Sequence, residues 1–247
     1  MEASAALRTT LPTALPTTEA PTAPPGRNRL AAEWTTALQP LRLLRQSGDL
    51  RRAPRGDGRL VVDIPGWLTG SESLVPLRWY LNSLGHRAEP WQLGRNGSDV
   101  EATVERFEPV LEQLVASGDG RPAFLVGWSL GGVIARETAR NRPDLVDRLV
   151  TFGTPAQGGP SFTAGASRFG AEECARIAAL QDEANRTDPL SLPTTAIYTK
   201  ADGVVDWKAC VDPWATNIRH VEVGSSHFGL GVDPDVWSII ARALAAE

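Results

Sequence analysis

The stretch that decides the fold is AFLVGWSLGGVIARETA, residues 123–139. It begins as an unbroken apolar run, which is typical of a buried β-strand, and continues with the apolar spacing of a helix. Ser129 stands between the two parts, with Gly127 and Gly131 two residues away on either side. Gly-x-Ser-x-Gly in this context predicts a strained turn that exposes the serine hydroxyl, because larger side chains at the glycine positions would collide with the neighbouring elements. The alternative is an ordinary turn whose serine caps the helix.

The chain around this stretch alternates between strand-like and helix-like segments. Expected strands lie at 59–66, 86–93, 122–128, 146–153, 194–200 and 218–223. Expected helices lie at 72–85, 98–118, 130–141 and 233–247, with Ser98 and Glu101 as a capping box for the second. Strands separated by helices of this length pair in parallel through right-handed crossovers. The sequence therefore predicts an α/β fold with a doubly wound, mostly parallel sheet.

Two regions fall outside this alternation. Residues 1–29 are rich in Thr, Pro and Ala, and we expect a flexible tail, followed by a helix over 30–47 that Pro40 kinks or divides. Residues 30–247 then form one domain. Within it, residues 156–193 contain one expected helix, 169–186, and no expected strand. Such an insert forms either a small lid or a static cover.

The composition excludes several classes of protein. The 247 residues are 42% hydrophobic and carry a net charge of −4, which gives no electrostatic reason to expect nucleic acid. No apolar run is long enough to span a membrane, and the start does not resemble a signal peptide, so a cytoplasmic location is expected. Cys174 and Cys210 are expected to be free thiols. No metal-ligand cluster stands out, and no metal or cofactor is expected. Oligomeric state is not readable.

A serine nucleophile needs a base and an acid on later loops. Of the three histidines, His86 falls at the opposite edge of the sheet and His220 falls inside a strand, whereas His227 follows the last strand in a loop rich in glycine and serine. We therefore expect His227 to be the general base. Asp202 comes directly after a strand and is the favoured acid, with Asp206 as the alternative.

Together these segments resemble the α/β-hydrolase superfamily, and in particular its small bacterial lipases and esterases. The resemblance rests on five motifs between residues 59 and 245: VVDIPGW, FLVGWSLGG, LVTFGTP, IYTKADGVVDW and GSSHFGLGVDP. Many relatives carry His-Gly where this chain has Pro65-Gly66. An oxyanion hole uses backbone N–H groups, so the resemblance still implies donors at Trp67 and Leu130.

The resemblance implies a serine hydrolase that cleaves a small-molecule carboxylic ester through Ser129, His227 and Asp202. Leu68 and Phe228 neighbour these positions and suggest an apolar substrate pocket, while Arg95 or Asn96 could orient a polar group of the substrate. Cleavage of an amide, thioester or lactone, acyl transfer, and a non-catalytic binding module remain the alternatives.

Overall fold

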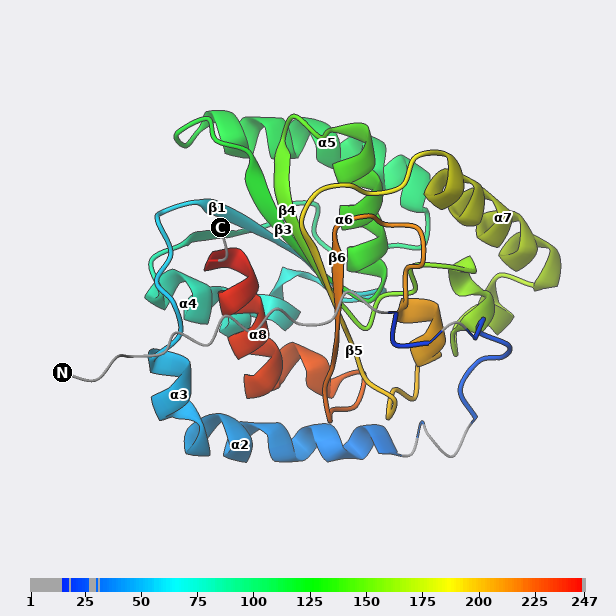
Figure 1. The fold of residues 1–247 in the computed structure, drawn as a ribbon, viewed down its shortest axis with the longest axis horizontal. Coiled ribbons are helices and arrows are strands. Elements are labelled where there is room, and N and C mark those ends of the chain that lie inside the picture. The colour runs from blue at the N-terminus through cyan, green and yellow to red at the C-terminus, as the bar shows by residue number, and fades with distance from the viewer. Residues whose placement is uncertain (1–14, 18, 27–29, 31, 246–247) are drawn as a thin grey trace.

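In the computed structural model, the described residues are 15–17, 19–26, 30 and 32–245. They form a six-stranded parallel sheet in the order β2-β1-β3-β4-β5-β6 (Figure 1). The strands are β1 Leu60–Ile64, β2 Arg87–Pro90, β3 Ala123–Trp128, β4 Val146–Phe152, β5 Thr194–Tyr198 and β6 Ile218–Glu222. The expected parallel, doubly wound sheet is confirmed.

Helices connect the strands and supply the rest of the core. The α-helices are α2 Gln39–Arg45, α3 Ser47–Arg51, α4 Val75–Ser83, α5 Val100–Ala116, α6 Leu130–Asn141, α7 Ala171–Thr187 and α8 Pro234–Ala245. The 3₁₀ helices are η1 Ala32–Leu38, η2 Ser71–Leu74, η3 Gly159–Phe162, η4 Ala166–Arg168, η5 Trp207–Cys210 and η6 Gly229–Val232. Within the described part of the chain, no helix is long and apolar enough to cross a membrane.

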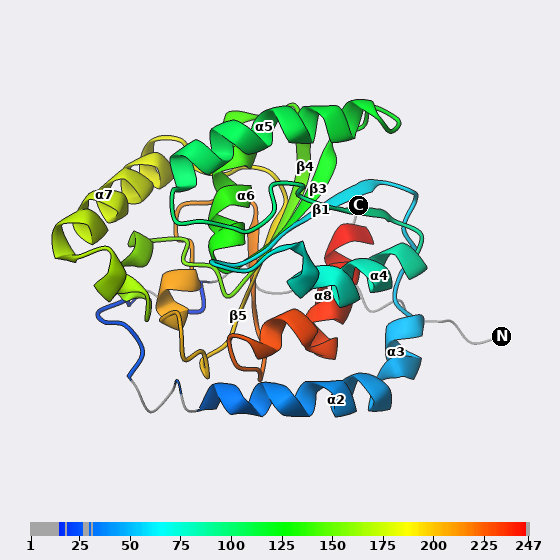
Figure 2. The ribbon, with the colours of Figure 1, turned by 180° about the vertical axis from the view of Figure 1, so that it is seen from behind.

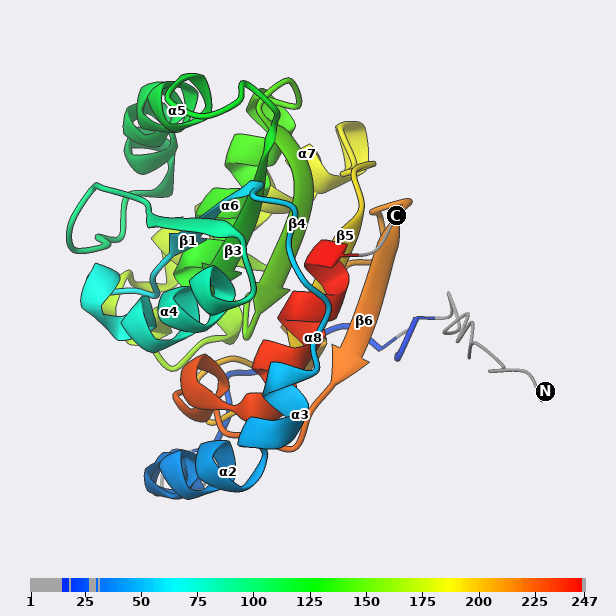
Figure 3. The same cartoon turned by 90° about the vertical axis from the view of Figure 1, so that its left-hand side faces the viewer.

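The sheet has a separate apolar core on each face. The cluster containing Leu77 and Ile240 joins α4 and α8 to one face, and the cluster containing Phe107 and Ile134 joins α5 and α6 to the other (Figure 2). Strands β1 and β3 are buried along their whole length, which explains their unbroken apolar sequence. β6 forms an edge of the sheet, is only partly buried and lies beside α8 in the view of Figure 3.

Some sequence expectations about helix ends were wrong. Asp99, and not Ser98, caps α5, because its side chain accepts a hydrogen bond from the Ala102 N–H at 3.0 Å. α3 continues past the helix end expected at Gly48. By contrast, the division expected near Pro40 is confirmed, because η1 ends at Leu38 and α2 begins at Gln39. The helix expected over 169–186 is present as α7.

The N-terminal segment packs against the end of the chain. α2 runs along the lower edge of the molecule in Figure 1, next to the segment that follows β6, and it contacts η6 and α8. The expected tail lies outside the described residues at 1–14, 18 and 27–29. In its described part, Pro21 is buried and the Glu19 carboxylate pairs with Lys208 Nζ at 2.5 Å.

Candidate active site

Ser129 occupies a strained turn between β3 and α6. Its backbone has φ 53° and ψ −122°, in the region of positive φ that residues with a side chain rarely adopt. The surrounding elements hold this conformation, since the Ser129 N–H donates to the carbonyl of Phe152 in β4 at 2.9 Å. The turn therefore presents the hydroxyl at the carboxyl edge of the sheet, as the sequence predicts.

The two flanking glycines permit this turn because other backbone passes very close to them. A Cβ atom on Gly127 would lie 2.4 Å from the Cα of Gly132 in α6, and one on Gly131 would lie 2.2 Å from the carbonyl oxygen of Ile64 in β1. Contacts this short do not occur, so any side chain would push α6 away from the sheet. The expected reason for both glycines is confirmed.

The structure brings together the three residues that the sequence proposes as a triad. His227 Nε2 lies 3.1 Å from Ser129 Oγ, and His227 Nδ1 lies 2.7 Å from Asp202 Oδ2. The side chains of His227 and Asp202 are buried, at 3% and 1% exposure, so water does not compete for the bond between them. In the tautomer that carries its proton on Nδ1, His227 donates to Asp202, and Nε2 is then able to accept a proton from the serine hydroxyl.

Asp202 has a second set of contacts that fixes its orientation. Its Oδ1 accepts the backbone N–H groups of Val204 at 2.8 Å and Val205 at 2.7 Å, while Oδ2 faces His227. The alternative acid, Asp206, instead caps η5 by accepting the Lys208 N–H at 3.2 Å. Of the two candidates, only Asp202 has a hydrogen bond to His227 in the described structure.

The other two histidines lie away from Ser129. His86 is buried at the amino end of β2, where burial lowers its pKa. His220 lies in β6, and its Nε2 accepts the Asp212 N–H at 3.0 Å.

The loop after β1 carries the expected oxyanion donor Trp67. No acceptor for the Trp67 N–H is found among the described residues, and the N–H of Leu130 is at the first position of α6, where helices leave amides without an internal partner. Asn96 holds this loop through two hydrogen bonds. Its side-chain Nδ2 donates to the carbonyl of Pro65 at 2.7 Å, and its backbone carbonyl accepts the Leu68 N–H at 2.9 Å.

A cavity of about 1220 Å³ opens beside Ser129 and His227. Leu68 and Phe228 line it, as expected, and both are about half exposed. Arg95 and Asn96 were wrongly expected here. The exposed Arg95 lies beside a separate small cavity next to Trp91, and Asn96 is fully buried under the loop after β1.

The insert forms the outer wall of this cavity. The ring of Phe169, after η4, lies 6.1 Å from the Trp67 ring, and the Arg168 guanidinium lies 5.4 Å over that same ring. Ile177 and Leu180 of α7 also line the cavity. The residue expected to donate to the oxyanion thus also contacts the insert through its side chain.

Comparisons with known proteins support this architecture. No protein-family model matches the chain. Over 96 residues it is 33% identical to the pimeloyl-[acyl-carrier protein] methyl ester esterase of Aliivibrio salmonicida, a match that covers 39% of this chain and only 36% of that protein. Among solved structures, it resembles the monoacylglycerol lipase of Paleococcus ferrophilus, with 16% identity, a TM-score of 0.56 and coverage of 78% of this chain and 94% of that one. A mouse α/β-hydrolase domain-containing protein has 17% identity and a TM-score of 0.54, with 76% and 88% covered. The chain has the α/β-hydrolase fold.

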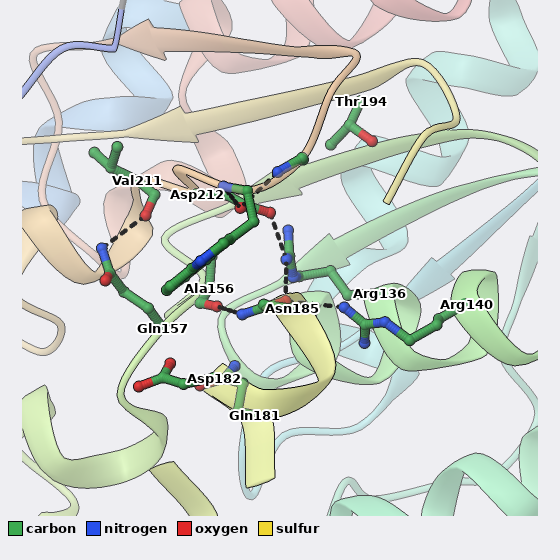
Figure 4. Close-up of polar contacts among 12 residues, drawn as sticks. Arg136, Arg140, Ala156, Gln157, Gln181, Asp182, Asn185, Thr194, Val211 and Asp212 are labelled. Atoms are coloured by element: carbon green, nitrogen blue, oxygen red, sulfur yellow. Dashed lines mark hydrogen bonds and ion pairs between the residues drawn. The ribbon is translucent and has the colours of Figure 1, made fainter. Parts of the chain in front are cut away.

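In this α/β-hydrolase fold the insert is anchored at the carboxyl end of α7. Figure 4 shows Asn185 at the centre of a buried polar cluster. Its Nδ2 donates to the Ala156 carbonyl at 2.7 Å, and its Oδ1 accepts from Arg136 at 3.0 Å and Arg140 at 2.9 Å. Arg136 also pairs with Asp212 at 2.6 Å, with both side chains 1% exposed. The carboxyl end of α7 is therefore tied to α6. Whether the insert moves as a lid stays a prediction.

Replacement of Gly131 tests the close approach of α6 to β1 in the α/β-hydrolase core. Gly131→Ala should lower the free energy of unfolding by about 1–3 kcal/mol, because the added methyl group meets the fixed Ile64 carbonyl. Gly97→Ala is the matched control: its Cβ would have no atom within 4 Å, so the change should be within about 0.5 kcal/mol. Urea denaturation of the three proteins measures both values. Equal stability of the two variants would contradict the tight packing.

Proposed function

We propose that the protein is a serine hydrolase that cleaves carboxylic esters. The observation that carries the proposal is the continuous hydrogen-bonded chain from Ser129 through His227 to Asp202, at a strained turn that opens into a cavity. A packed turn with a capping serine would not require this arrangement. The esterase and lipase names of the similar proteins favour an ester over other acyl bonds.

In the proposed reaction, Ser129 Oγ attacks the ester carbonyl while His227 Nε2 takes its proton. Asp202 holds the Nδ1 proton and stabilises the imidazolium that forms. The tetrahedral intermediate then expels the alcohol, which receives the proton from Nε2, and an acyl-serine remains. Water, deprotonated by the same nitrogen, attacks the acyl group. The bond between the acyl group and Ser129 Oγ then breaks, Nε2 returns the proton to Oγ, and the acid is released.

The negative charge of the tetrahedral intermediate would be stabilised by the N–H groups of Trp67 and Leu130. Donors that are held in place before the reaction need no reorganisation when the charge develops, and one such donor contributes about 3 kcal/mol in other hydrolases. The hydrogen bonds between Asn96 and the loop after β1 supply that fixed position for Trp67. Pro65 in place of a histidine therefore does not remove the donor.

The cavity favours a substrate with an apolar part. Leu68, Leu180 and Phe228 are exposed apolar side chains at its lining, and the less exposed Val133 and Ile177 also line it. Apolar surface of this kind gains free energy when an acyl or alcohol chain displaces water from it. We therefore propose esters with a chain of several methylene groups as substrates.

A fluorophosphonate probe tests the nucleophile. Intact protein should be labelled on Ser129, and Ser129→Ala should lose both labelling and ester hydrolysis, because no other serine in the described site has a histidine beside it. Mass spectrometry of the labelled peptide identifies the residue. Labelling that survives in Ser129→Ala would overturn the assignment. A labelled protein without ester turnover would favour another acyl bond, and an unlabelled one a binding module.

The role of the acid is tested by a pair of substitutions. Asp202→Asn should lower kcat by about 10⁴-fold, because an asparagine no longer holds the reactive tautomer of the histidine. Asp206→Asn changes the same chemical group four residues away, at the cap of η5, and should leave kcat close to that of the unmodified protein. Steady-state kinetics on one activated ester compare the two. The opposite order would assign the role to Asp206.

The apolar cavity predicts a dependence on acyl length. Across p-nitrophenyl acetate, butyrate, hexanoate and octanoate, kcat/KM should rise by up to about fourfold for each buried methylene group, since burial contributes about 0.8 kcal/mol per group. Phe228→Ala, which removes one wall of the cavity, should reduce this rise more than it reduces turnover of the acetate. A kcat/KM that falls from acetate onward would contradict an acyl site in this cavity.

A further inference from the structure

A carboxylate from the N-terminal segment reaches the two loops that carry Asp202 and His227. Glu33 lies in η1, outside the part of the chain that resembles hydrolases, and is only 8% exposed. Its Oε1 accepts the backbone N–H of Gly203 at 2.9 Å and that of His227 at 3.0 Å. Its Oε2 accepts the Phe228 N–H at 2.9 Å. One side chain thus accepts hydrogen bonds from three backbone N–H groups.

The positions of these donors matter more than their number. Gly203 directly follows Asp202, and Phe228 directly follows His227, while His227 donates its own amide. The two loops are 25 residues apart in sequence and meet at the 2.7 Å bond between Asp202 and His227. Glu33 bridges their backbones next to that bond, so it fixes the distance between the acid and the base.

The same segment makes further polar contacts along the loop of the histidine. These contacts join the segment 33–42 to the residues between β6 and α8: Thr36 Oγ1 to Ser226 Oγ at 3.0 Å, Gln39 Nε2 to Ser225 Oγ at 3.2 Å, and Arg42 to Asp233 and Asp235 at 2.6 Å each. The loop itself contains only the short helix η6, so it has little regular structure to hold the histidine. The N-terminal segment supplies the missing support.

We propose that Glu33 is a positioning residue for the reaction, acting through the backbones of the Asp202 and His227 loops. This inference rests on the proposed function. A carboxylate suits the role because both of its oxygens accept hydrogen bonds and its charge strengthens them. A glutamine of the same shape has one acceptor oxygen and one NH₂ donor. If the NH₂ takes the place of Oε1, it faces the N–H groups of Gly203 and His227, and if it takes the place of Oε2, it faces the N–H of Phe228. In either orientation, a hydrogen bond to the loop of His227 is lost.

Glu33→Gln tests the proposal on the full-length protein with an activated ester. We expect kcat to fall about 10- to 100-fold with KM nearly unchanged, because misplacing a catalytic group slows the chemical step more than it weakens binding. Glu172→Gln is the matched control, since it removes an exposed carboxylate in the first turn of α7 and should leave kcat unchanged. Unchanged kcat in Glu33→Gln would overturn the proposal.

A second comparison separates positioning from general stability. Thr36→Ala removes one neutral contact between the same helix and the same loop, so a merely structural role of η1 predicts similar kcat values for Thr36→Ala and Glu33→Gln. We expect a clearly smaller kcat loss in Thr36→Ala when thermal unfolding shows both variants folded. If Glu33→Gln does not fold, Glu33→Asp takes its place: its shorter carboxylate should lower kcat in the same way, and an unchanged kcat would overturn the proposal.

A spectroscopic measurement keeps this test independent of the proposed reaction. The proton shared by His227 Nδ1 and Asp202 should give a low-field NMR resonance in the unmodified protein, and this resonance should weaken or shift in Glu33→Gln but not in Glu172→Gln. Absence of ester hydrolysis and probe labelling in the unmodified protein would refute the proposed function alone. An unchanged resonance in Glu33→Gln would refute the role of Glu33.

Discussion

The positive φ of Ser129 is the constraint on which the site depends. A serine in this conformation is stable only when the surrounding backbone leaves no alternative. The necessary closeness comes from Gly127 and Gly131, which let α6 approach both its own strand and the end of β1. Because β1 also leads into the loop of Trp67, the same contact sets the distance between the proposed nucleophile and a proposed oxyanion donor. One close approach of backbone therefore positions two parts of the site.

The parallel sheet explains why residues distant in sequence meet. The carboxyl ends of β1, β3, β5 and β6 lie at one edge, and the loop after each brings one part of the site there. The acid and the base then share a buried hydrogen bond, which is stronger where water is excluded. The sheet thus brings the loops that carry the site residues to the same edge. Finer placement depends on contacts such as those of Asn96 and Glu33.

These two kinds of contact differ in how far they can be read from sequence. The turn at Ser129 is a local pattern, because the strand, the glycines and the helix lie within seventeen consecutive residues. His227 and Asp202 follow from their places after predicted strands. Asn96 and Glu33 carry no such signal: Asn-Gly reads as a turn, and Glu33 acts on residues 170 to 195 positions away. Arg95 was misplaced because the direction of a loop side chain depends on tertiary packing.

Trp67 links the shape of the cavity to the chemistry. Its ring packs against Phe169 and Arg168 of the insert, while its amide is the proposed oxyanion donor. A substrate that displaces the Trp67 ring would therefore also displace the Trp67 backbone amide, which has to face the reacting carbonyl. If that amide stabilises the oxyanion, good and poor substrates differ in the rate of the chemical step and not in their binding to the cavity. Two esters could then bind equally well and still be processed at very different speeds.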